Sequence, residues 1–367
     1  MGRLRYRARG AGAGAGKSRA GMALTIIWLL LALVSQSACA SGATRSPQAT
    51  QRATAAASPC DVAATAAAGA SNPHAYQPAP TEPLTYGVNL AMYDTSDDVV
   101  NDPSIQAEMR SYGVPIIRMP FRTTLSDAYE TQAMQAIRAL GALPLIIVHG
   151  PTDKSALTDD VHIVRLAQHV FGAGTVYVEF GNEPELAGIS ASAYAASWNT
   201  VIACLKHLAP TYKYIGPVNA FYDPQYVATF DQLARPRPDF NSWHEYACAT
   251  FESNDACMSH LDGWSSHVTG MREAVQAAIG VTIPMMLTEW NLDDKPDPRY
   301  HDAAFIQTWT SAALSVLAAN RANGLYAAMQ YCVTNNPSFK LIDSSGALTP
   351  AGEAFFGALR QTRGGQP

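Results

Sequence analysis

The sequence predicts an α/β fold of the (β/α)8 TIM-barrel class over residues 81–361, and three observations support this. Eight short apolar runs recur about every 34 residues, and each is followed by a polar loop and a helical pattern. Strands that are apolar on both faces and alternate with helices form parallel sheets covered on both sides. Eight such units in about 280 residues favour a closed barrel over an open doubly wound sheet. No Gly-x-Gly-x-x-Gly follows any run, which argues against a dinucleotide-binding fold.

The segments between these runs carry helical periodicity. The clearest stripe lies between the fourth and fifth runs and consists of Tyr194, Trp198, Val201, Ile202, Leu205 and Leu208. The eight expected strands are LTYGVNL (84–90), VPIIRMP (114–120), LPLIIVH (143–149), VYVEFGN (176–182), YKYIGPV (212–218), FNSWHEY (240–246), IPMMLTEW (283–290) and LYAAMQY (325–331).

Residues 1–40 have the layout of a secretory signal peptide. Six basic and no acidic residues precede the apolar run Met22–Val34, and Ala38-Cys39-Ala40 resembles an Ala-x-Ala cleavage site. The apolar run has 13 residues, short of the about 20 that cross a bilayer as a helix. Cys39 also resembles the lipid-modified cysteine of a bacterial lipoprotein, although Gln36 stands where a leucine is usual. We therefore expect a protein that is secreted or anchored at the cell surface.

Residues 41–80 are expected to be a disordered linker. They are rich in Ala, Thr, Ser and Pro and nearly lack large apolar side chains, so they bury too little surface to offset the entropy of ordering. With the first 40 residues removed, 19 basic and 30 acidic residues remain, a net charge of −11. Such an acidic chain lacks the charge that binds nucleic acid or anionic lipid. We expect neither partner beyond a possible N-terminal lipid anchor.

The cysteines are interpreted for an oxidising compartment, where disulfides persist. Cys248 and Cys257 are close in sequence, and a bridge that closes ten residues stabilises by about 2.7 kcal/mol in the chain-entropy model. This pair is favoured. An alternative is a zinc site made of His244, Cys248, Cys257 and His260, although their spacing fits no common structural zinc site.

Two of the expected strands end in a carboxylate. Asn182-Glu183-Pro184 ends the fourth strand and Thr288-Glu289-Trp290 the seventh. In a closed barrel the carboxyl ends of all strands form one mouth, where catalytic side chains lie. Glycoside hydrolysis uses two such groups, one to protonate the leaving oxygen and one to attack the anomeric carbon or activate water. Taken alone, Glu183 is also a common helix-start residue and Glu289 an ordinary loop acid.

Other polar side chains reach the same mouth. Arg118 ends the second strand, His149 the third, and His244 and Tyr246 the sixth, where alternation puts both on one face. A buried Arg118 needs a carboxylate partner, for which Glu289 is a candidate. Five of the eight strands thus contribute ionisable groups to one rim.

Residues 84–361 resemble the catalytic barrel of clan A retaining glycoside hydrolases, the group that includes families 5 and 39. The matching motifs are GNEP (181–184), SWHEY (242–246), LTEW (287–290) and the arginine of IIRMP (116–120). The resemblance implies Glu183 as general acid and base and Glu289 as nucleophile. It further implies that Asn182 donates to the sugar 2-hydroxyl, that Arg118, His244 and Tyr246 support the carboxylates, and that no cofactor or metal is needed.

The chain departs from the clan at the end of the eighth strand. Clan members usually carry a tryptophan there as a platform for the sugar, whereas this sequence has Gln330, Tyr331 and Cys332. We expect Tyr331 or Trp290 to contact the substrate instead. The missing tryptophan also leaves open a non-catalytic carbohydrate-binding barrel on the cell surface. An inverting hydrolase is a third possibility, which the distance between the two carboxyl groups tests.

Several further residues have interpretations other than catalysis. Glu179 is expected to form a structural pair with an arginine below the mouth, and Glu185 to be a loop acid. A calcium site is possible in the loop after the seventh strand, although an acidic loop containing proline is the preferred interpretation. The acids of this loop are Asp293, Asp294 and Asp297. Four aromatic residues either line sugar subsites or pack in the core, and the sequence does not decide between the two: His149, Trp243, Trp264 and His301.

Overall fold

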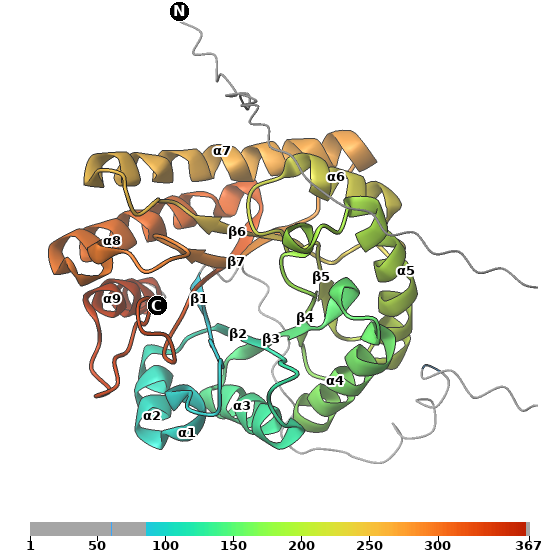
Figure 1. The fold of residues 1–367 in the computed structure, drawn as a ribbon, viewed down its shortest axis with the longest axis horizontal. Coiled ribbons are helices and arrows are strands. Elements are labelled where there is room, and N and C mark those ends of the chain that lie inside the picture. The colour runs from blue at the N-terminus through green and yellow to red at the C-terminus, as the bar shows by residue number, and fades with distance from the viewer. Residues whose placement is uncertain (1–59, 61–85, 365–367) are drawn as a thin grey trace, which may run out of the picture. The chain divides into compact units, whose positions relative to one another are not determined.

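The computed structural model describes Cys60 and residues 86–364. Within them, eight strands run parallel in the order β5-β4-β3-β2-β1-β8-β7-β6, so the predicted (β/α)8 barrel is confirmed. Figure 1 shows the strands at the centre of a ring of helices. The expected signal peptide and, apart from Cys60, the expected linker lie outside the described residues.

Every expected strand is present, with slightly shorter bounds. The strands are β1 (Tyr86–Asn89), β2 (Ile116–Pro120), β3 (Leu143–Val148), β4 (Tyr177–Phe180), β5 (Lys213–Ile215), β6 (Asn241–Tyr246), β7 (Met285–Asn291) and β8 (Leu325–Gln330).

The ring closes between β5 and β6 through irregular backbone. Two isolated parallel bridges close it: the last residue of β5, Ile215, pairs with Phe240 just before β6, and Asn219 in the loop after β5 pairs with Trp243 of β6. Backbone hydrogen bonds support them, among them His244 N to Asn219 O at 2.8 Å. The loop after β5 is thereby fixed at the mouth of the barrel.

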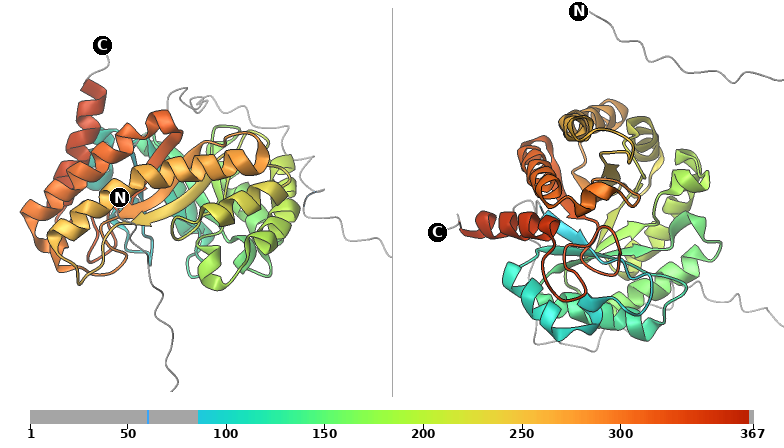
Figure 2. Two further views of the ribbon diagram at one scale, coloured as in Figure 1. Left: turned by 90° about the horizontal axis from the view of Figure 1, so that it is seen from above. Right: turned by 60° about the vertical axis from the view of Figure 1, so that its left-hand side comes forward.

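Helices follow each strand and cover the outside of the sheet (Figures 1 and 2). The stripe predicted on α5 faces the barrel: Tyr194, Trp198 and Ile202 are fully buried. In Figure 2 the C-terminal end of α9 projects from the ring. None of the helices in the described part of the chain is long and apolar enough to cross a membrane. The helices are α1 (Asp98–Asn101), α2 (Pro103–Tyr112), α3 (Asp127–Leu140), α4 (Ala156–Phe171), α5 (Ala191–Leu208), α6 (Pro224–Leu233), α7 (Asn254–Ile279), α8 (Ala303–Ala319) and α9 (Pro350–Gly364), with the 3-10 turns η2 (Gly150–Thr152), η3 (Pro184–Ala187), η4 (Pro298–His301) and η5 (Arg321–Asn323).

The interior of the barrel is filled by a small apolar cluster separate from the larger core under the helices. It contains Ile116, Leu143, Leu145, Tyr177, Ile215, Phe240, Met286, Ala327 and Met329. The barrel is therefore solid at this level, and polar groups from the strand ends lie above a water-excluding floor.

A β-bulge in β7 sets which side chains face the interior. Trp243 of β6 pairs with Leu287 and the next residue, His244, pairs with Glu289, so Thr288 is an extra residue. A bulge of this kind changes the facing of the residues that follow it. Glu289 consequently points into the barrel mouth and Trp290 points outward to the helices.

The described residues include two disulfides. Cys248 and Cys257 are bonded, which confirms the favoured pair and rules out the zinc site that would have needed both thiols. Cys60, inside the expected linker, is bonded to Cys204 of α5. Cys332 is a free, buried thiol.

Candidate active site

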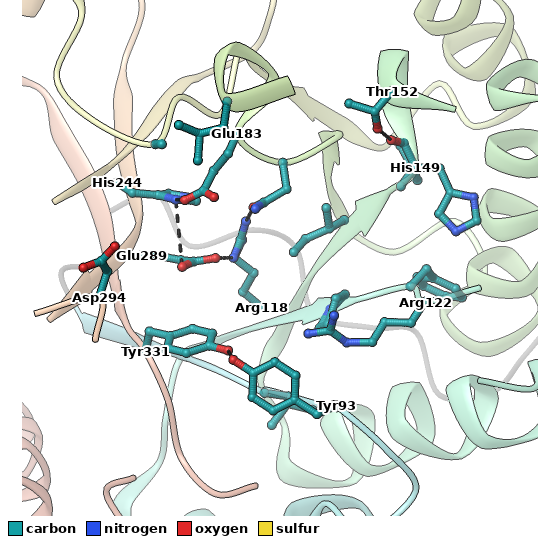
Figure 3. A pocket seen from close by; sticks show the side chains of 18 of the residues that line it. Tyr93, Arg118, Arg122, His149, Thr152, Glu183, His244, Glu289, Asp294 and Tyr331 are labelled. Atoms are coloured by element: carbon teal, nitrogen blue, oxygen red, sulfur yellow. Dashed lines mark hydrogen bonds and ion pairs between the residues drawn. The ribbon is translucent and has the colours of Figure 1, made fainter. Parts of the chain in front are cut away.

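A cleft of about 1180 Å³ opens at the carboxyl ends of the strands. Its lining includes seven of the eight residues expected to contact substrate or perform chemistry: Arg118, Asn182, Glu183, His244, Tyr246, Glu289 and Tyr331. His149, which the sequence left undecided, also lines it. Figure 3 shows Arg118, His244 and Glu289, which come from different strands, pointing toward one another with Glu183 beside them.

Glu183 follows β4 in an unusual backbone conformation. Its φ of 48° and ψ of 53° lie in the left-handed region, which is costly for a residue with a side chain and is found mainly where function requires it. The preceding turn depends on close backbone approach, because a Cβ on Gly150 would lie 2.5 Å from the Cα of Gly181. Glycine at 150 thus lets the ends of β3 and β4 meet and aims Glu183 across the cleft.

Glu289 is held by donors on both of its oxygens. Arg118 Nη1 donates to Oε1 at 2.5 Å, and the Tyr246 hydroxyl donates to Oε2 at 2.7 Å. His244 Nδ1 lies 3.8 Å from Oε2. The expected pairing of Arg118 with Glu289 is therefore confirmed, and the geometry fixes the position of this carboxylate.

Arg118 is the centre of the hydrogen-bond network below the carboxylates. It is fully buried and donates Nε to Glu179 at 2.6 Å, which confirms the structural role expected for Glu179. It also donates Nη2 to Asn182 Oδ1 at 2.7 Å and Nη1 to Asn89 Oδ1 at 3.0 Å. Because the amide oxygen of Asn182 faces Arg118, its NH2 group is left to donate to a ligand.

The charges around Glu289 favour its ionised form. Burial raises its pKa, but the charges of His244 and Arg118 and the hydrogen bonds from Tyr246 and Arg118 outweigh burial, so its pKa lies below the usual value. Burial lowers the pKa of His244, but the nearby Glu289 and Glu183 raise it above its usual value on balance. Burial and the charge of Glu289 hold the pKa of Tyr246 well above its usual value, so this hydroxyl keeps its proton.

The two glutamates face each other across His244. His244 Nδ1 lies 2.8 Å from Glu183 Oε1. One carboxylate oxygen of Glu183, one of Glu289 and a ring nitrogen of His244 all lie within 4.8 Å of one another. These three groups are also of metal-ligating types, but Arg118 and Tyr246 already occupy both oxygens of Glu289. The arrangement therefore suits a fixed Glu289 carboxylate next to a Glu183 that exchanges protons better than it suits a cation site.

Tyr331 belongs to a chain of contacts on the side of the cleft opposite Glu183 (Figure 3). Its hydroxyl lies 2.5 Å from that of Tyr93, and the guanidinium of Arg122 lies 5.0 Å from the centre of the Tyr93 ring. Arg122 in turn donates to Ala91 O at 2.7 Å. Tyr331 thus lines the cleft, and its role as the substitute for the missing tryptophan stays a prediction.

The expectation that Trp290 contacts substrate is wrong. Trp290 is fully buried and packs with Trp264, Trp309 and Phe355 outside the barrel. The bulge at Thr288 explains this, because it turns Glu289 inward and leaves its neighbour facing the helices.

Glu185 is more than a loop acid. It is partly buried, and its Oε1 accepts a hydrogen bond from Ala220 N at 2.5 Å. Burial raises its pKa, with the hydrogen bonds it accepts acting in the opposite direction. It therefore joins the segment after β4 to the segment after β5.

The structure also places the residues that the sequence left undecided. Trp243 and Trp264 are buried in the core, and His301 lies at the end of η4. Asp297 forms an ion pair with Arg299 at 2.5 Å, and Asp293 accepts from Thr250 at 2.9 Å, while Asp294 lines the cleft. His149 Nδ1 lies 3.4 Å from Asp153 and 3.9 Å from Asp159 on the cleft wall.

Sequence reasoning missed several residues in the cleft and directly below it. Asn89 ends β1, is buried and fixes Arg118, and its polar side chain at a strand end was a usable signal. Tyr93, Arg122 and Phe221 come from loops and Leu186 from the short turn η3, where no periodicity marks them.

Comparisons with known proteins support the fold. No protein-family model and no curated protein sequence matches this chain. Solved structures similar to it include a glucosidase from Croceicoccus marinus (15% identity, 78% of this chain and 69% of that chain, TM-score 0.56). They also include a family 51 α-L-arabinofuranosidase from Bifidobacterium longum (14% identity, 78% of this chain and 74% of that chain, TM-score 0.57). A third is a monomeric β-xylosidase from Caulobacter crescentus CB15 (17% identity, 75% of this chain and 67% of that chain, TM-score 0.53). The resemblance to clan A glycoside hydrolases is thereby confirmed at the level of the fold.

Proposed function

We propose that this protein is a retaining β-glycosidase with Glu289 as nucleophile and Glu183 as general acid and base. The observation that carries the proposal is the convergence of the two carboxyl groups at one cleft, where one oxygen of Glu183 lies within 4.8 Å of one oxygen of Glu289. Carboxyl groups about 5 to 5.5 Å apart are typical of retaining enzymes, whereas about 6.5 to 9.5 Å leaves room for the water of an inverting reaction. The short separation therefore favours retention.

The first step of the proposed reaction breaks the glycosidic bond. The ionised Glu289 attacks the anomeric carbon and forms an ester with the sugar, while Glu183 gives its proton to the departing oxygen. Arg118 and Tyr246 orient Glu289 for this attack through fixed hydrogen bonds. The NH2 group of Asn182 is placed to donate to a hydroxyl of the sugar.

The second step releases the sugar. Glu183, now a carboxylate, takes a proton from water, the water oxygen bonds to the anomeric carbon, and the ester bond to Glu289 breaks. Glu183 suits both steps because it is the more exposed of the two carboxylates, with 27% of its side chain accessible against 12% for Glu289.

The test is a hydrolysis screen combined with product stereochemistry. Purified protein is offered aryl β-xyloside, glucoside, mannoside, galactoside and glucuronide, together with an aryl α-L-arabinofuranoside because one similar structure is an arabinofuranosidase. Proton NMR then identifies the anomer that forms first. A first product with the configuration of the substrate supports retention, and the opposite anomer would indicate inversion. Binding of glycans without hydrolysis of any of them would favour the carbohydrate-binding barrel.

We also propose that the protein is exported. The predicted signal peptide and the disulfides Cys60–Cys204 and Cys248–Cys257 support an oxidising destination. N-terminal sequencing of protein from the culture medium would show whether cleavage occurs near Ala40. Labelling with a radioactive fatty acid that is lost in Cys39→Ser would instead establish the lipid anchor.

A further inference from the structure

Two large apolar side chains are exposed inside the cleft. Leu186 is 64% and Phe221 is 51% accessible, and both line the cleft together with Ala220. Exposure of large apolar side chains forgoes the stabilisation of burial, and exposed apolar surface within a cleft marks a ligand-binding surface. We call Leu186, Ala220 and Phe221 the apolar patch.

The apolar patch is tied to the backbone of Glu183. Leu186 N donates to Glu183 O at 3.1 Å, and Glu183 N donates to Val218 O at 2.9 Å, three residues before Phe221. The apolar patch and Glu183 therefore hold a fixed relation to each other.

Glu185 fixes the two halves of the apolar patch to one another. Its Oε1 accepts from Ala220 N at 2.5 Å, which connects the turn that carries Leu186 with the loop that carries Phe221. A partly buried carboxylate used for this purpose indicates that the patch is a built surface. The backbone that carries its side chains is held in place by these hydrogen bonds before any ligand arrives.

The position of the apolar patch relative to the two glutamates indicates which part of the substrate it faces. In the proposed reaction Glu183 gives its proton to the leaving oxygen, so the leaving group lies beside Glu183. Figure 3 shows Glu183 on one side of Glu289 and Tyr331 and Tyr93 on the other side. The apolar patch, joined to Glu183, therefore lies on the leaving-group side.

We propose that the apolar patch is the leaving-group subsite and that it takes an aryl or alkyl alcohol. This inference rests on the proposed glycosidase function. Leu186, Ala220 and Phe221 have no polar side-chain atom to pair with sugar hydroxyls, which a subsite specific for a sugar needs. A sugar stacked through its C–H face offers related apolar chemistry, and the test below separates the two.

The first experiment compares leaving groups on one sugar, using the glycone found in the hydrolysis screen. The kcat/KM of methyl, hexyl and benzyl β-glycosides and of a β-linked disaccharide is measured for the wild type and for Phe221→Ala and Leu186→Ala. The wild type is expected to prefer benzyl over methyl, and Phe221→Ala to reduce this benzyl-to-methyl ratio about tenfold. Phe251→Ala and Leu233→Ala are matched controls, because both residues are exposed and neither lines the cleft. They should keep the wild-type ratio.

The second experiment uses transfer to an alcohol. Benzyl alcohol that binds the apolar patch intercepts the glycosyl-enzyme. Its oxygen bonds to the anomeric carbon in place of water, the ester bond to Glu289 breaks, and Glu183 takes the hydroxyl proton. The ratio of benzyl glycoside to free sugar should fall in Phe221→Ala and stay at the wild-type value in Phe251→Ala. Both substituted side chains are solvent-exposed, and a thermal melt checks that each variant folds.

The outcomes are distinct. Equal benzyl-to-methyl and transfer ratios in the wild type and Phe221→Ala would overturn the leaving-group subsite while leaving the proposed function intact. A wild type that prefers the disaccharide over the benzyl glycoside would overturn the choice of an aryl or alkyl alcohol. If the folded wild type hydrolyses no glycoside, the proposed function fails, and this inference fails with it.

Discussion

The surroundings of Glu289 differ sharply from those of Glu183. Glu289 receives hydrogen bonds from Arg118 and Tyr246 on its two oxygens and is the less accessible carboxylate. The side chain of Glu183 contacts His244 through Oε1 and is more than twice as accessible as that of Glu289. A nucleophile must be ionised and fixed, whereas an acid that later acts as a base must exchange its proton with solvent. The difference therefore supports the two proposed roles on physical grounds, without recourse to the resemblance.

Removing the carboxylate of Glu289 is expected to have the largest effect. Glu289→Gln keeps the shape of the side chain but cannot form the ester, so kcat/KM on an activated aryl glycoside should fall about 10⁴-fold or more. Glu273→Gln, an exposed position on α7, is the matched control. Wild-type-like activity in Glu289→Gln, with an unchanged melting temperature, would remove it as the nucleophile.

Removing Glu183 is expected to have a smaller effect that depends on the leaving group. Glu183→Ala should lose about 10²- to 10⁴-fold on a poor leaving group, because general acid catalysis is lost, and much less on an activated phenol in the first step. Azide should then restore turnover and give the β-glycosyl azide, since it attacks the glycosyl-enzyme without needing a base. Product of the opposite configuration would show that the two roles are exchanged.

Removing the Tyr246 hydroxyl tests whether its hydrogen bond helps to keep Glu289 ionised. The hydrogen bond stabilises the carboxylate and lowers its pKa, so Tyr246→Phe should move the pKa of Glu289 upward. Activity needs the ionised form, and the acid limb of the kcat/KM profile should therefore move to higher pH. The loss of a hydrogen bond to a charged group is expected to cost tenfold to about a hundredfold in rate. Tyr326→Phe, at the amino end of β8, should leave the limb in place.

Much of the fold was predictable from the sequence because strands buried on both faces leave a strong pattern. The strand ends that carry Glu183, Glu289, Arg118, Asn182 and His244 followed from the same pattern, since the carboxyl ends of all strands in a barrel form one mouth. The Cys248–Cys257 bond was predictable from short spacing.

Other parts of the site were not predictable, for physical reasons. The bulge at Thr288 depends on how β7 pairs with β6, so simple alternation could not tell that Trp290 faces the helices. Glu185 binds Ala220, 35 residues away, and no local pattern reveals such a contact. Tyr93 and Phe221 lie in loops whose paths are set by neighbouring loops.

The smallest effect is expected on the opposite side of the cleft, at the pair of Tyr331 and Tyr93. Tyr331→Phe removes one hydroxyl contact and should raise KM about threefold with little change in kcat, because one neutral hydrogen bond contributes about 1 kcal/mol. Tyr331→Ala also removes the ring and should raise KM more than tenfold if the ring is a platform for the sugar. Tyr93→Phe removes the same hydrogen bond from the other side, so the double variant Tyr331→Phe with Tyr93→Phe should be no worse than either single one. Additive effects would mean that each hydroxyl contacts the substrate separately. The side of the cleft opposite Glu183 would then bind the sugar through polar contacts rather than through an aromatic ring.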